Sequence, residues 1–541
     1  MGAEHAGTFE DSFSTDPAGL PEAVAPTLVR LRHGDRFALR IAPVAKRIGD
    51  DVVRMIAYNG SIPGPVLQVD QGSEVIVDVT NDGDTEATVH WHGLRLENRY
   101  DGVPDQTQAP IRAGGTFSYR LQFPDAGFYW YHPHVREDYG IEMGLYGTII
   151  VEPSDPSCWA PADRQLSITL DDVLMEDGRI APFRRTGPTF TAMGRFGNVM
   201  LTNGATRFSA EVAAGEVVRL CLLNTANTRT FNVGLAGARM KLVGGDSGRY
   251  DHETFVDEVR LAPSERAIVD VLFDTSGEVK LQHRGPDRSY DLGAFAVTAG
   301  AAGDAARALS VRRRLNALAA ERASLATYLD REPDKVLAFS SLMPILYGGA
   351  EVPADSYVCP MHPDIVSNEP ATCPRCGMKL VPSRGLTAPA AEDHHHGDGT
   401  DHADDGIEWE DLMPEINRQT DARNMIWKII DRETGAENTE IRWTFTVGDR
   451  VKIRLVNEVE GSEHPMHHPF HIHGAGRFLV VSRQGVPEPN LVWKDTVLVP
   501  AGQAVDLLFE VTNPGRWMAH CHIAEHHQNG MVFTFDVEDW S

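Results

Sequence analysis

The sequence predicts an all-β protein built from three copies of one Greek-key sandwich or barrel unit. Three segments share a pattern in which a glycine is followed by alternating apolar residues and, nine positions on, by an asparagine. They run from Gly72 to Asn81, from Gly215 to Asn224 and from Gly448 to Asn457. Such alternation is typical of a strand with one buried face, and its recurrence indicates a repeated domain.

A second related segment follows each repeat and consists of a turn, an alternating strand, a glycine turn and another strand. The three segments read IRAGGTFSYRLQFPDAGFYWYH, LAPSERAIVDVLFDTSGEVKLQH and LVPAGQAVDLLFEVTNPGRWMAHCH. A chain of 541 residues is too long for one hydrophobic core and is expected to form three or four domains. A hydrophobic content of 42% is enough to bury several cores.

The third repeat begins much further from the second than the second does from the first, which indicates an insertion. Its start is rich in Ala, Arg and Leu and predicts a short helical linker, and the stretch AEDHHHGDGTDHADD has the composition of a disordered linker. The predicted organisation is a first β unit at 25–155, a second at 160–300, a helical or irregular linker at 301–354, a small metal-binding insert at 355–383, an acidic His-rich linker at 384–405 and a third β unit at 406–541.

Composition excludes some classes of function. The net charge of −27 argues against a nucleic-acid partner, because phosphate contacts need a basic surface. No uninterrupted run of about 18 apolar residues occurs, so we expect no membrane span. Four of the six cysteines fall in metal-type motifs, and the remaining Cys158 and Cys221 do not make a disulfide framework.

Histidine pairs gather in the first and third repeats, at the ends of predicted strands. The motifs HWHG, HPH, HPFHIHG and HCHIAEHHQNGM supply four His-x-His pairs. Residues i and i+2 of a strand point to the same face, so each pair presents two imidazoles together. The pairs are His90 with His92, His132 with His134, His471 with His473, and His520 with His522. Eight imidazoles that converge between two domains can hold three metal ions.

A different centre is predicted on the opposite face of the last strand. Cys521 lies between His520 and His522 and must point away from them. His468 is an odd step from His471 and can turn toward Cys521. With His526 and the more distant Met531, these residues form a set of two imidazoles, one thiolate and a weak thioether, which is typical of a blue-copper electron-transfer centre.

The four motifs resemble the copper signatures of the multicopper oxidases, over residues 25–300 and 406–541. The resemblance implies three cupredoxin domains and four copper ions, one of type 1, one of type 2 and two of type 3. It implies that His90 and His471 bind the type 2 copper and that His468, Cys521 and His526 bind the type 1 copper, with Met531 axial. The type 3 ligands would be His92, His132, His134, His473, His520 and His522.

The resemblance also suggests two catalytic groups besides Cys521. Asp101 resembles the acidic residue that feeds protons to bound dioxygen, although an aspartate before Gly102 also suits a plain turn. His527 stands where bacterial relatives often carry a glutamate of the proton path. A histidine can relay protons near neutral pH, and the alternative is a solvated loop residue.

The insert has its own motif, with Cys359, His362, Cys373 and Cys376 spaced as two short chelating pairs. Such pairs suit a tetrahedral soft-metal site for one zinc or copper ion. Met361 and Met378 would favour Cu(I), whereas a structural zinc knuckle is the alternative. The segment resembles small heavy-metal-binding domains of copper transporters and efflux adaptors. The linker histidines, including His394 and His402, are interpreted as filler.

The sequence therefore predicts a laccase-like enzyme that oxidises phenol-like reductants at a type 1 copper and reduces dioxygen to water at a trinuclear cluster. The alternative is a cuprous or other metal-ion oxidase, or a copper-handling protein of metal tolerance, which the insert favours. The stretch from Met1 to Pro17 lacks a basic start and an apolar core. We expect a periplasmic or extracytoplasmic protein if a signal was removed and a cytoplasmic one otherwise. The oligomeric state is not predicted.

Overall fold

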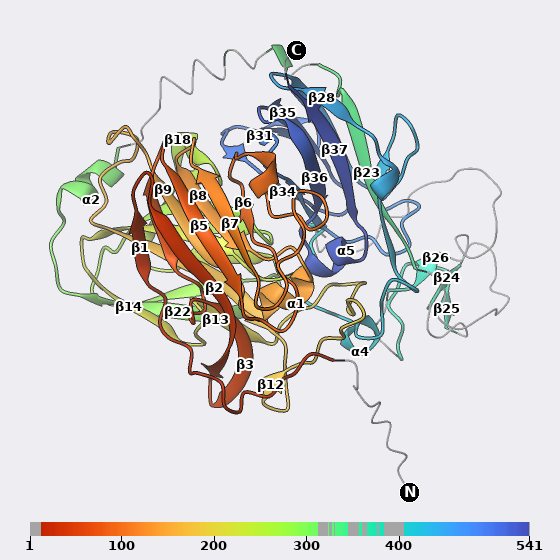
Figure 1. The fold of residues 1–541 in the computed structure, drawn as a ribbon, viewed down its shortest axis with the longest axis horizontal. Helices are drawn as coiled ribbons and strands as arrows, with labels where there is room; N and C mark the ends of the chain where they lie inside the picture. The colour runs from red at the N-terminus through yellow and green to blue at the C-terminus, as the bar shows by residue number, and fades with distance from the viewer. Residues whose placement is uncertain are drawn as a thin grey trace, which may run out of the picture.

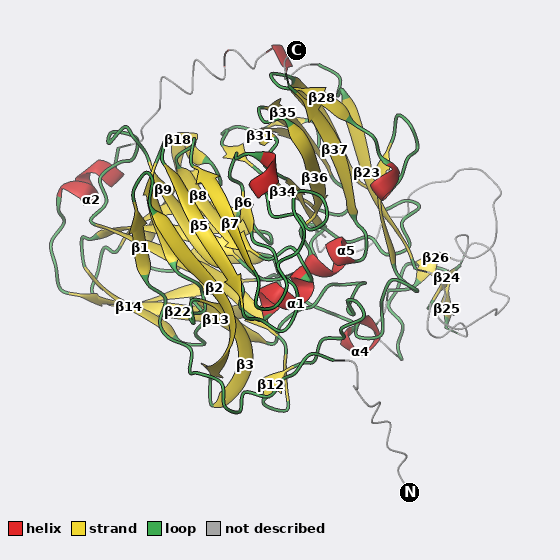
Figure 2. Ribbon diagram, in the orientation of Figure 1, coloured by secondary structure: helices red, strands yellow, loops and turns green. Residues whose placement is uncertain are grey.

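The computed structural model describes residues 12–311, 323, 327–328, 331–343, 356–359, 365–375, 377, 379–382 and 405–539. These residues form three two-sheet β units of the expected all-β class, together with a small three-stranded sheet and a few short helices. In Figure 1 the first unit (red to orange) and the third unit (blue) face one another, and helices α1 and α5, drawn red in Figure 2, lie at their junction.

The first unit has two sheets. In spatial order, one contains β1 (Leu28–Leu31), β4 (Val66–Asp70), β9 (Gly147–Glu152), β8 (Gly127–His132) and β6 (His90–His92); the other contains β3 (Asp51–Tyr58), β2 (Arg36–Ile48), β5 (Glu74–Asn81) and β7 (Thr116–Gln122). Between them lies a buried aliphatic and aromatic core. The 3-10 turn η1 (Asn98–Tyr100) and helix α1 (Glu137–Glu142) follow β6 and β8.

The second unit repeats this design. One sheet contains β13 (Val199–Thr202), β10 (Arg164–Val173), β15 (Val217–Asn224), β20 (Arg266–Leu272), β17 (Arg239–Gly245) and β18 (Gly248–Val256); the other contains β14 (Phe208–Ala213), β22 (Ser289–Thr298), β21 (Gly277–Arg284), β16 (Phe231–Leu235) and β19 (Glu258–Leu261). A hairpin of β11 (Met175–Glu176) and β12 (Arg179–Ile180) forms a separate two-stranded sheet, and helix α2 (Asp304–Leu309) packs against β15 and β20.

The third unit carries the C-terminus. One sheet contains β27 (Ile426–Asp431), β23 (Lys335–Leu342), β29 (Arg450–Asn457), β35 (Ala504–Val511), β31 (Gly476–Arg483), β32 (Val486–Pro487) and β33 (Trp493–Lys494); the other contains β28 (Thr444–Thr446), β37 (Val532–Glu538), β36 (Gly515–Cys521), β30 (His468–Ile472) and β34 (Thr496–Val499). Helices α4 (Pro414–Asn417) and α5 (Ala524–Gln528) and the turn η3 (Asn438–Glu440) connect its strands.

The sequence repeats correspond to β5, β15 and β29, and their shared glycine and asparagine have structural causes. The glycines that precede these strands have φ between +84° and +95°, which favours residues without a Cβ. At the other end, the side-chain amide of each asparagine donates to two backbone carbonyls. Asn81, Asn224 and Asn457 therefore tie down the loops that follow the three equivalent strands.

The position of the insert differs from the sequence-based expectation. Strand β23 lies within 301–354, the segment assigned to a linker, yet it pairs in parallel with β29 as β2 pairs with β5 and β10 with β15. It is therefore the first strand of the third unit. The insert, with β24 (Tyr357–Val358), β25 (Val366–Ser367) and β26 (Val381–Pro382), lies in the connection from β23 to β27, inside that unit.

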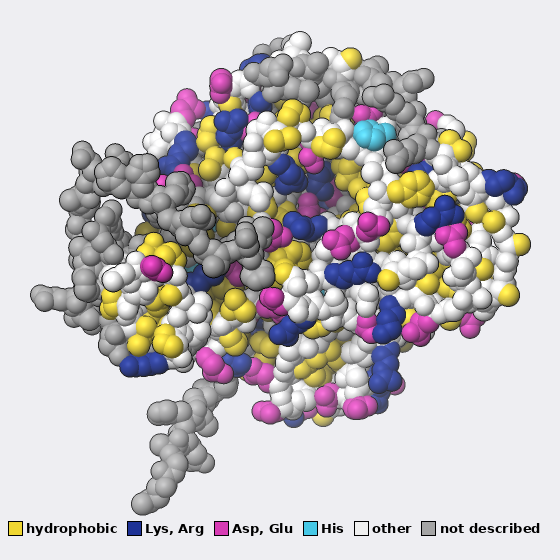
Figure 3. Space-filling model, turned by 180° about the vertical axis from the view of Figure 1, so that it is seen from behind, with side chains coloured by type: hydrophobic (Ala, Val, Ile, Leu, Met, Phe, Trp, Pro, Cys, Tyr) yellow, Lys and Arg dark blue, Asp and Glu magenta, His cyan; other side chains and the backbone are white. Residues whose placement is uncertain are grey.

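Within the described residues, no helix is both long and apolar enough to cross a bilayer. The face drawn in Figure 3 carries acidic and basic side chains interspersed with one another. Much of the linker at 384–405 and of the helical stretch predicted within 301–354 lies outside the described residues.

Candidate metal centre between the first and third units

Two antiparallel strand pairs carry the predicted imidazoles. In the first unit, β6 and β8 place His90 opposite His132. His92 lies two residues after His90, and His134 lies two residues after His132. In the third unit, β30 and β36 place His471 opposite His520. All eight members of the four pairs are buried, with at most 3% of each residue exposed.

The two units bring these imidazoles together. The Nε2 atom of His473 lies 3.3 Å from Nε2 of His134 in the first unit and 3.1 Å from Nε2 of His520. The rings of His92 and His471 stack across the interface with centroids 3.8 Å apart. Nitrogen atoms of several three-residue sets lie within 4.8 Å of one another, a spacing that suits metal binding. These sets include His90, His92 and His132; His90, His471 and His473; and His134, His473 and His520.

In four of these imidazoles, a hydrogen bond donated by Nδ1–H directs the second ring nitrogen, Nε2, into the cluster. The Nδ1–H groups donate to nearby carbonyls, from His90 to Asp101, from His132 to Pro133, from His471 to Asp495 and from His520 to Cys521, over 2.7–2.9 Å. Each such bond fixes the tautomer and leaves Nε2 as the electron-pair donor. The arrangement is thus preset for metal binding through Nε2.

Burial keeps most of these imidazoles neutral, the form that binds metals. It lowers the pKa of His473 and of His522 to about 4 each. It lowers the pKa of five others well below the usual value: His92, His132, His134, His471 and His520. Burial acts the same way on His90, but the Asp101 carboxylate outweighs it and raises the pKa of that imidazole.

The donor set fits copper. Among the described residues, the Nε2 atoms of His90, His471 and His522 are buried without a hydrogen-bond partner. Buried polar atoms are normally paired, so three orphaned nitrogens directed into one cluster indicate a place for cations. Imidazole is a ligand that copper favours.

The second centre lies on the other face of β36, as strand parity predicts. The Sγ atom of Cys521 lies 3.5 Å from Nδ1 of His468 and 3.8 Å from Nδ1 of His526. Met531 is fully buried. Its backbone carbonyl accepts a hydrogen bond from the Cys521 N–H, and its N–H donates to the His526 carbonyl. Burial raises the pKa of the Cys521 thiol well above its usual range, so a bound cation is needed to make it a thiolate.

Asp101 lies against the histidine cluster rather than in an exposed turn. Its Oδ2 accepts a 2.8 Å hydrogen bond from Nδ1–H of His473, and its Oδ1 lies 3.3 Å from Nδ1 of His90. Burial alone would raise the pKa of Asp101, but the two imidazoles outweigh it and hold that pKa well below the usual value. The carboxylate therefore stays ionised beside two cluster histidines.

The sequence did not identify Glu137, which contacts His527. Nδ1–H of His527 donates to Oε2 of Glu137 over 2.5 Å, and the His527 ring stacks on His520 with centroids 4.1 Å apart. The other oxygen, Oε1, lies 3.3 Å from Nδ1 of His132. The pair joins α1 of the first unit to α5 of the third. The only sequence signal was the position of Glu137 three residues after His134.

The insert packs against the third unit. Cys359 and Cys373 are buried in the same apolar cluster as Trp427, Phe470 and Cys521. The Lys379 ammonium pairs with Glu408, which anchors the insert to the segment before α4. The other two predicted ligands, His362 and Cys376, lie outside the described residues.

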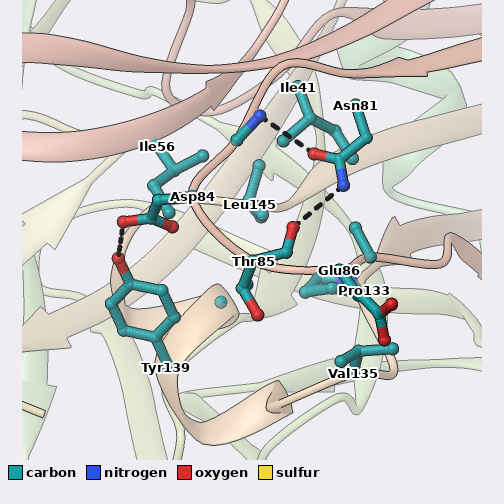
Figure 4. Close-up of a pocket in the computed structure, with 13 residues that line it drawn as sticks. Ile41, Ile56, Asn81, Asp84, Thr85, Glu86, Pro133, Val135, Tyr139 and Leu145 are labelled. Carbon is teal, nitrogen blue, oxygen red and sulfur yellow. Dashed lines mark hydrogen bonds between the residues drawn. The ribbon is translucent and has the colours of Figure 1, made fainter. Parts of the chain in front are cut away.

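Two of the cavities formed by the described residues lie away from the imidazoles and can be compared in size with a substrate. One, of about 10 Å³, lies beside Pro133 and has space for about one water; in it Tyr139 donates to Asp84 and Asn81 donates to the Thr85 carbonyl (Figure 4). The other, of about 490 Å³, opens between the second and third units and is lined by charges of both signs, among them Arg260, Glu488 and Lys494. The first is too small for an organic substrate.

Comparison with known proteins agrees with this geometry. Two family models described as multicopper oxidase match residues 43–156 and 412–541, and one described as heavy metal binding domain matches 356–383. Multicopper oxidase MmcO of Mycobacterium tuberculosis is 27% identical, over 96% of this chain and 91% of its own length. Laccase-1 of Botryotinia fuckeliana is 24% identical, over 88% and 77% of the respective chains.

Solved structures of multicopper oxidases share this fold. The crystal structure of a multicopper oxidase from Pseudomonas thermotolerans superposes with a TM-score of 0.63, covers 94% of this chain and all of its own, and is 24% identical. The fold, the histidine and cysteine motifs and these family matches together identify a copper-dependent oxidoreductase. This chain belongs to the multicopper oxidase family and carries an inserted heavy-metal-binding domain.

Proposed function

We propose that the chain binds four copper ions and couples one-electron oxidation of a reducing substrate to four-electron reduction of dioxygen to water. The type 1 ion would be held by His468, Cys521 and His526, with Met531 axial. The type 2 ion would be held by His90 and His471. The type 3 pair would be held by the remaining imidazoles, which are His92, His132, His134, His473, His520 and His522.

The observation that carries this proposal is the double role of one short segment. His520 and His522 turn toward the histidine cluster, and Cys521 between them turns toward His468 and His526. Bound copper would supply the redox chemistry, taking electrons at the Cys521 centre and passing them to dioxygen at the cluster. The backbone from Cys521 to its two neighbours provides a short covalent path between the centres.

Protons for dioxygen reduction need groups beside the cluster. We assign that role to Asp101, whose ionised carboxylate is hydrogen-bonded to His473 and close to His90. His527 and Glu137 form a second hydrogen-bonded pair, against His134 and His520. Each acid–imidazole contact offers a place where a proton can be held and passed on.

Two kinds of reductant remain candidates at the type 1 site. Relatives named laccases support phenol-like molecules. Small metal ions such as Cu(I) are favoured by the burial of His526, whose ring is fully covered and stacks under Trp427 with centroids 4.1 Å apart. The docked insert also favours metal handling, with one zinc or copper ion held by Cys359, His362, Cys373 and Cys376.

The test compares turnover of a phenolic dye with turnover of Cu(I), each with and without added copper, by following dioxygen uptake. A phenol oxidase is expected to turn over the dye without added copper once its four sites are loaded. A metal-ion oxidase is expected to turn over Cu(I) far faster than the dye. Copper-loaded protein that consumes no dioxygen with either reductant would contradict the proposed function.

A further inference from the structure

Arg266 of the second unit reaches the histidine cluster through one carboxylate. Its side chain is completely buried at the start of β20. Its Nη1 and Nη2 donate to the two oxygens of Asp495 in the third unit, over 2.7 and 2.5 Å. This is a bidentate pair between a planar guanidinium and a carboxylate, which fixes orientation as well as charge.

Asp495 in turn sets the direction of His92 in the first unit. The Nε2–H of His92 donates to Oδ1 of Asp495 over 2.9 Å. His92 is thereby turned opposite to His90, His132 and His471, which donate through Nδ1. Its Nδ1 faces the cluster instead, 3.4 Å from Nε2 of His132.

We propose that Arg266 is a positioning residue for the copper cluster: it holds Asp495 so that His92 presents Nδ1, rather than Nε2, to the metal. The inference rests on the proposed function and gives the second unit, which contributes no imidazole to the cluster, a part in building it. Arg266 also donates through Nε to the carbonyl of Phe128 in the first unit, over 3.0 Å. This one side chain of the second unit thus hydrogen-bonds to both the first and the third unit.

Gly93, which follows His92 in the HWHG motif, provides independent support for the role of the Arg266–Asp495 pair. A Cβ at this position would overlap the Asp495 carboxylate and the Arg266 guanidinium. The residue also has φ of +86°. The backbone next to His92 is therefore shaped around the Arg266–Asp495 pair, as expected if the pair has a function at the cluster.

The cost of burying charge also explains why Arg266 and Asp495 occur together. A buried carboxylate without a partner is costly, and Arg266 pairs with both oxygens of Asp495 while His92 donates to one of them. Thr496 adds a further donor to Oδ1 of Asp495 over 3.0 Å, and Ser264 of the second unit donates to Thr496 in turn. The carboxylate is therefore held from several sides.

The matched control is Arg219 with Asp270. This pair is also bidentate, with two distances of 2.8 Å, and is also buried in the second unit. It links β15 to β20 within one sheet instead of bridging units. The Arg219→Met variant thus measures how much breaking a buried ion pair in this unit changes copper content and activity in general. That change is subtracted from the change measured for Arg266→Met.

The experiment compares Arg266→Met, Arg266→Lys and Arg219→Met in the full-length, copper-loaded protein. Copper per chain, the EPR spectrum, the blue absorption and the rate of dioxygen reduction are measured. Arg266→Met is expected to disturb the EPR signals or occupancy of the cluster and to slow dioxygen reduction about 10- to 100-fold. The blue absorption and the anaerobic reduction of the type 1 site stay unchanged. Arg266→Lys, which keeps the charge and one donor, is expected to recover part of the loss.

Equal copper content, EPR spectra and dioxygen reduction in Arg266→Met and Arg219→Met would overturn the inference. If Arg266→Met does not fold, Asp495→Asn is compared with Asp270→Asn by the same measurements, because both changes conserve side-chain size. Equal results for these two variants would likewise overturn the inference. A wild-type protein that binds no copper at the cluster would instead contradict the proposed function. The two failures are therefore distinguishable.

Discussion

At the scale of single residues, the alternation of His520, Cys521 and His522 along one strand divides the site into two centres. Strand parity was enough to predict this from sequence, since neighbouring side chains must point to opposite faces. The partners that orient the imidazoles were harder to predict. Asp495 lies 403 residues from His92 and Glu137 lies 390 residues from His527, so no local pattern identifies these contacts.

Replacing the thiol tests the first centre. Cys521→Ser is expected to remove the blue colour and the oxidase activity while the fold persists, because the hydroxyl replaces both the proposed ligand and the electron path. Visible absorption, copper content and circular dichroism measure these effects. A blue and active Cys521→Ser protein would exclude the type 1 assignment.

Replacing the carboxylate beside His473 tests proton delivery. Asp101→Asn is expected to slow dioxygen reduction far more than reduction of the type 1 site, because the amide cannot accept and release a proton. Stopped-flow measurements under anaerobic and aerobic conditions separate the two steps. If both steps slow equally, Asp101 has only a structural role.

At the scale of secondary-structure elements, the repeat predicted β5, β15 and β29 and the sheets around them. It did not predict that β23 starts the third unit, because KVLAFSSL alternates poorly and precedes the insert. Helices α1 and α5 were also missed. They are only six and five residues long, too short for a helical period to emerge, and they are stabilised by contacts between units.

Helix α1 gives the protein a predictable response to pH. Burial raises the pKa of Glu142 to about 7, outweighing the Arg195 guanidinium 2.9 Å away. The folded state thus holds this proton more tightly than the unfolded state does. Its contribution is complete below about pH 4.5 and is lost as the pH rises through about 7, which is worth on the order of 3 kcal/mol.

Glu142→Gln is therefore expected to flatten the fall in melting temperature of the copper-free protein between about pH 5 and pH 8. The exposed Glu211→Gln serves as the control and is expected to follow the wild-type profile. An unchanged profile in Glu142→Gln would show that this carboxyl does not titrate in that window.

At the scale of the whole molecule, three units with the same two-sheet architecture contribute different groups to the site. The first and third supply the imidazoles, and the second supplies Arg266 and other buried contacts, such as the hydrogen bonds from Asn227 and Thr228 to Glu525 in α5. The sequence indicated that the metal site would span the first and third repeats. It did not indicate what the second contributes, because an isolated arginine in a strand carries no motif.

The insert offers a test at this scale. Its described cysteines pack into the core of the third unit, so point substitutions disturb the fold less than a deletion of residues 355–383. Cys373→Ser combined with Cys376→Ser is expected to cost one soft metal ion per chain and to lower Cu(I) oxidation or copper loading. Dye-dependent dioxygen reduction is expected to persist in pre-loaded protein, because the insert contributes none of the proposed catalytic ligands.

Cys158→Ser is the matched control for these cysteine changes, since Cys158 lies outside both proposed copper sites and the insert. Metal analysis under reducing conditions gives the stoichiometry. Unchanged metal content in the double variant would leave the insert without a metal site. Loss of dye oxidation at full copper loading would show that the insert belongs to the working structure of the oxidase.

The central claim is that the Cys521 centre and the histidine cluster together deliver four electrons to one molecule of dioxygen. The most direct measurement is the ratio of substrate oxidised to dioxygen consumed by the copper-loaded wild-type protein, with hydrogen peroxide assayed in the same solution. The account predicts four one-electron oxidations per dioxygen and no accumulation of peroxide. A ratio of two with stoichiometric peroxide would contradict it.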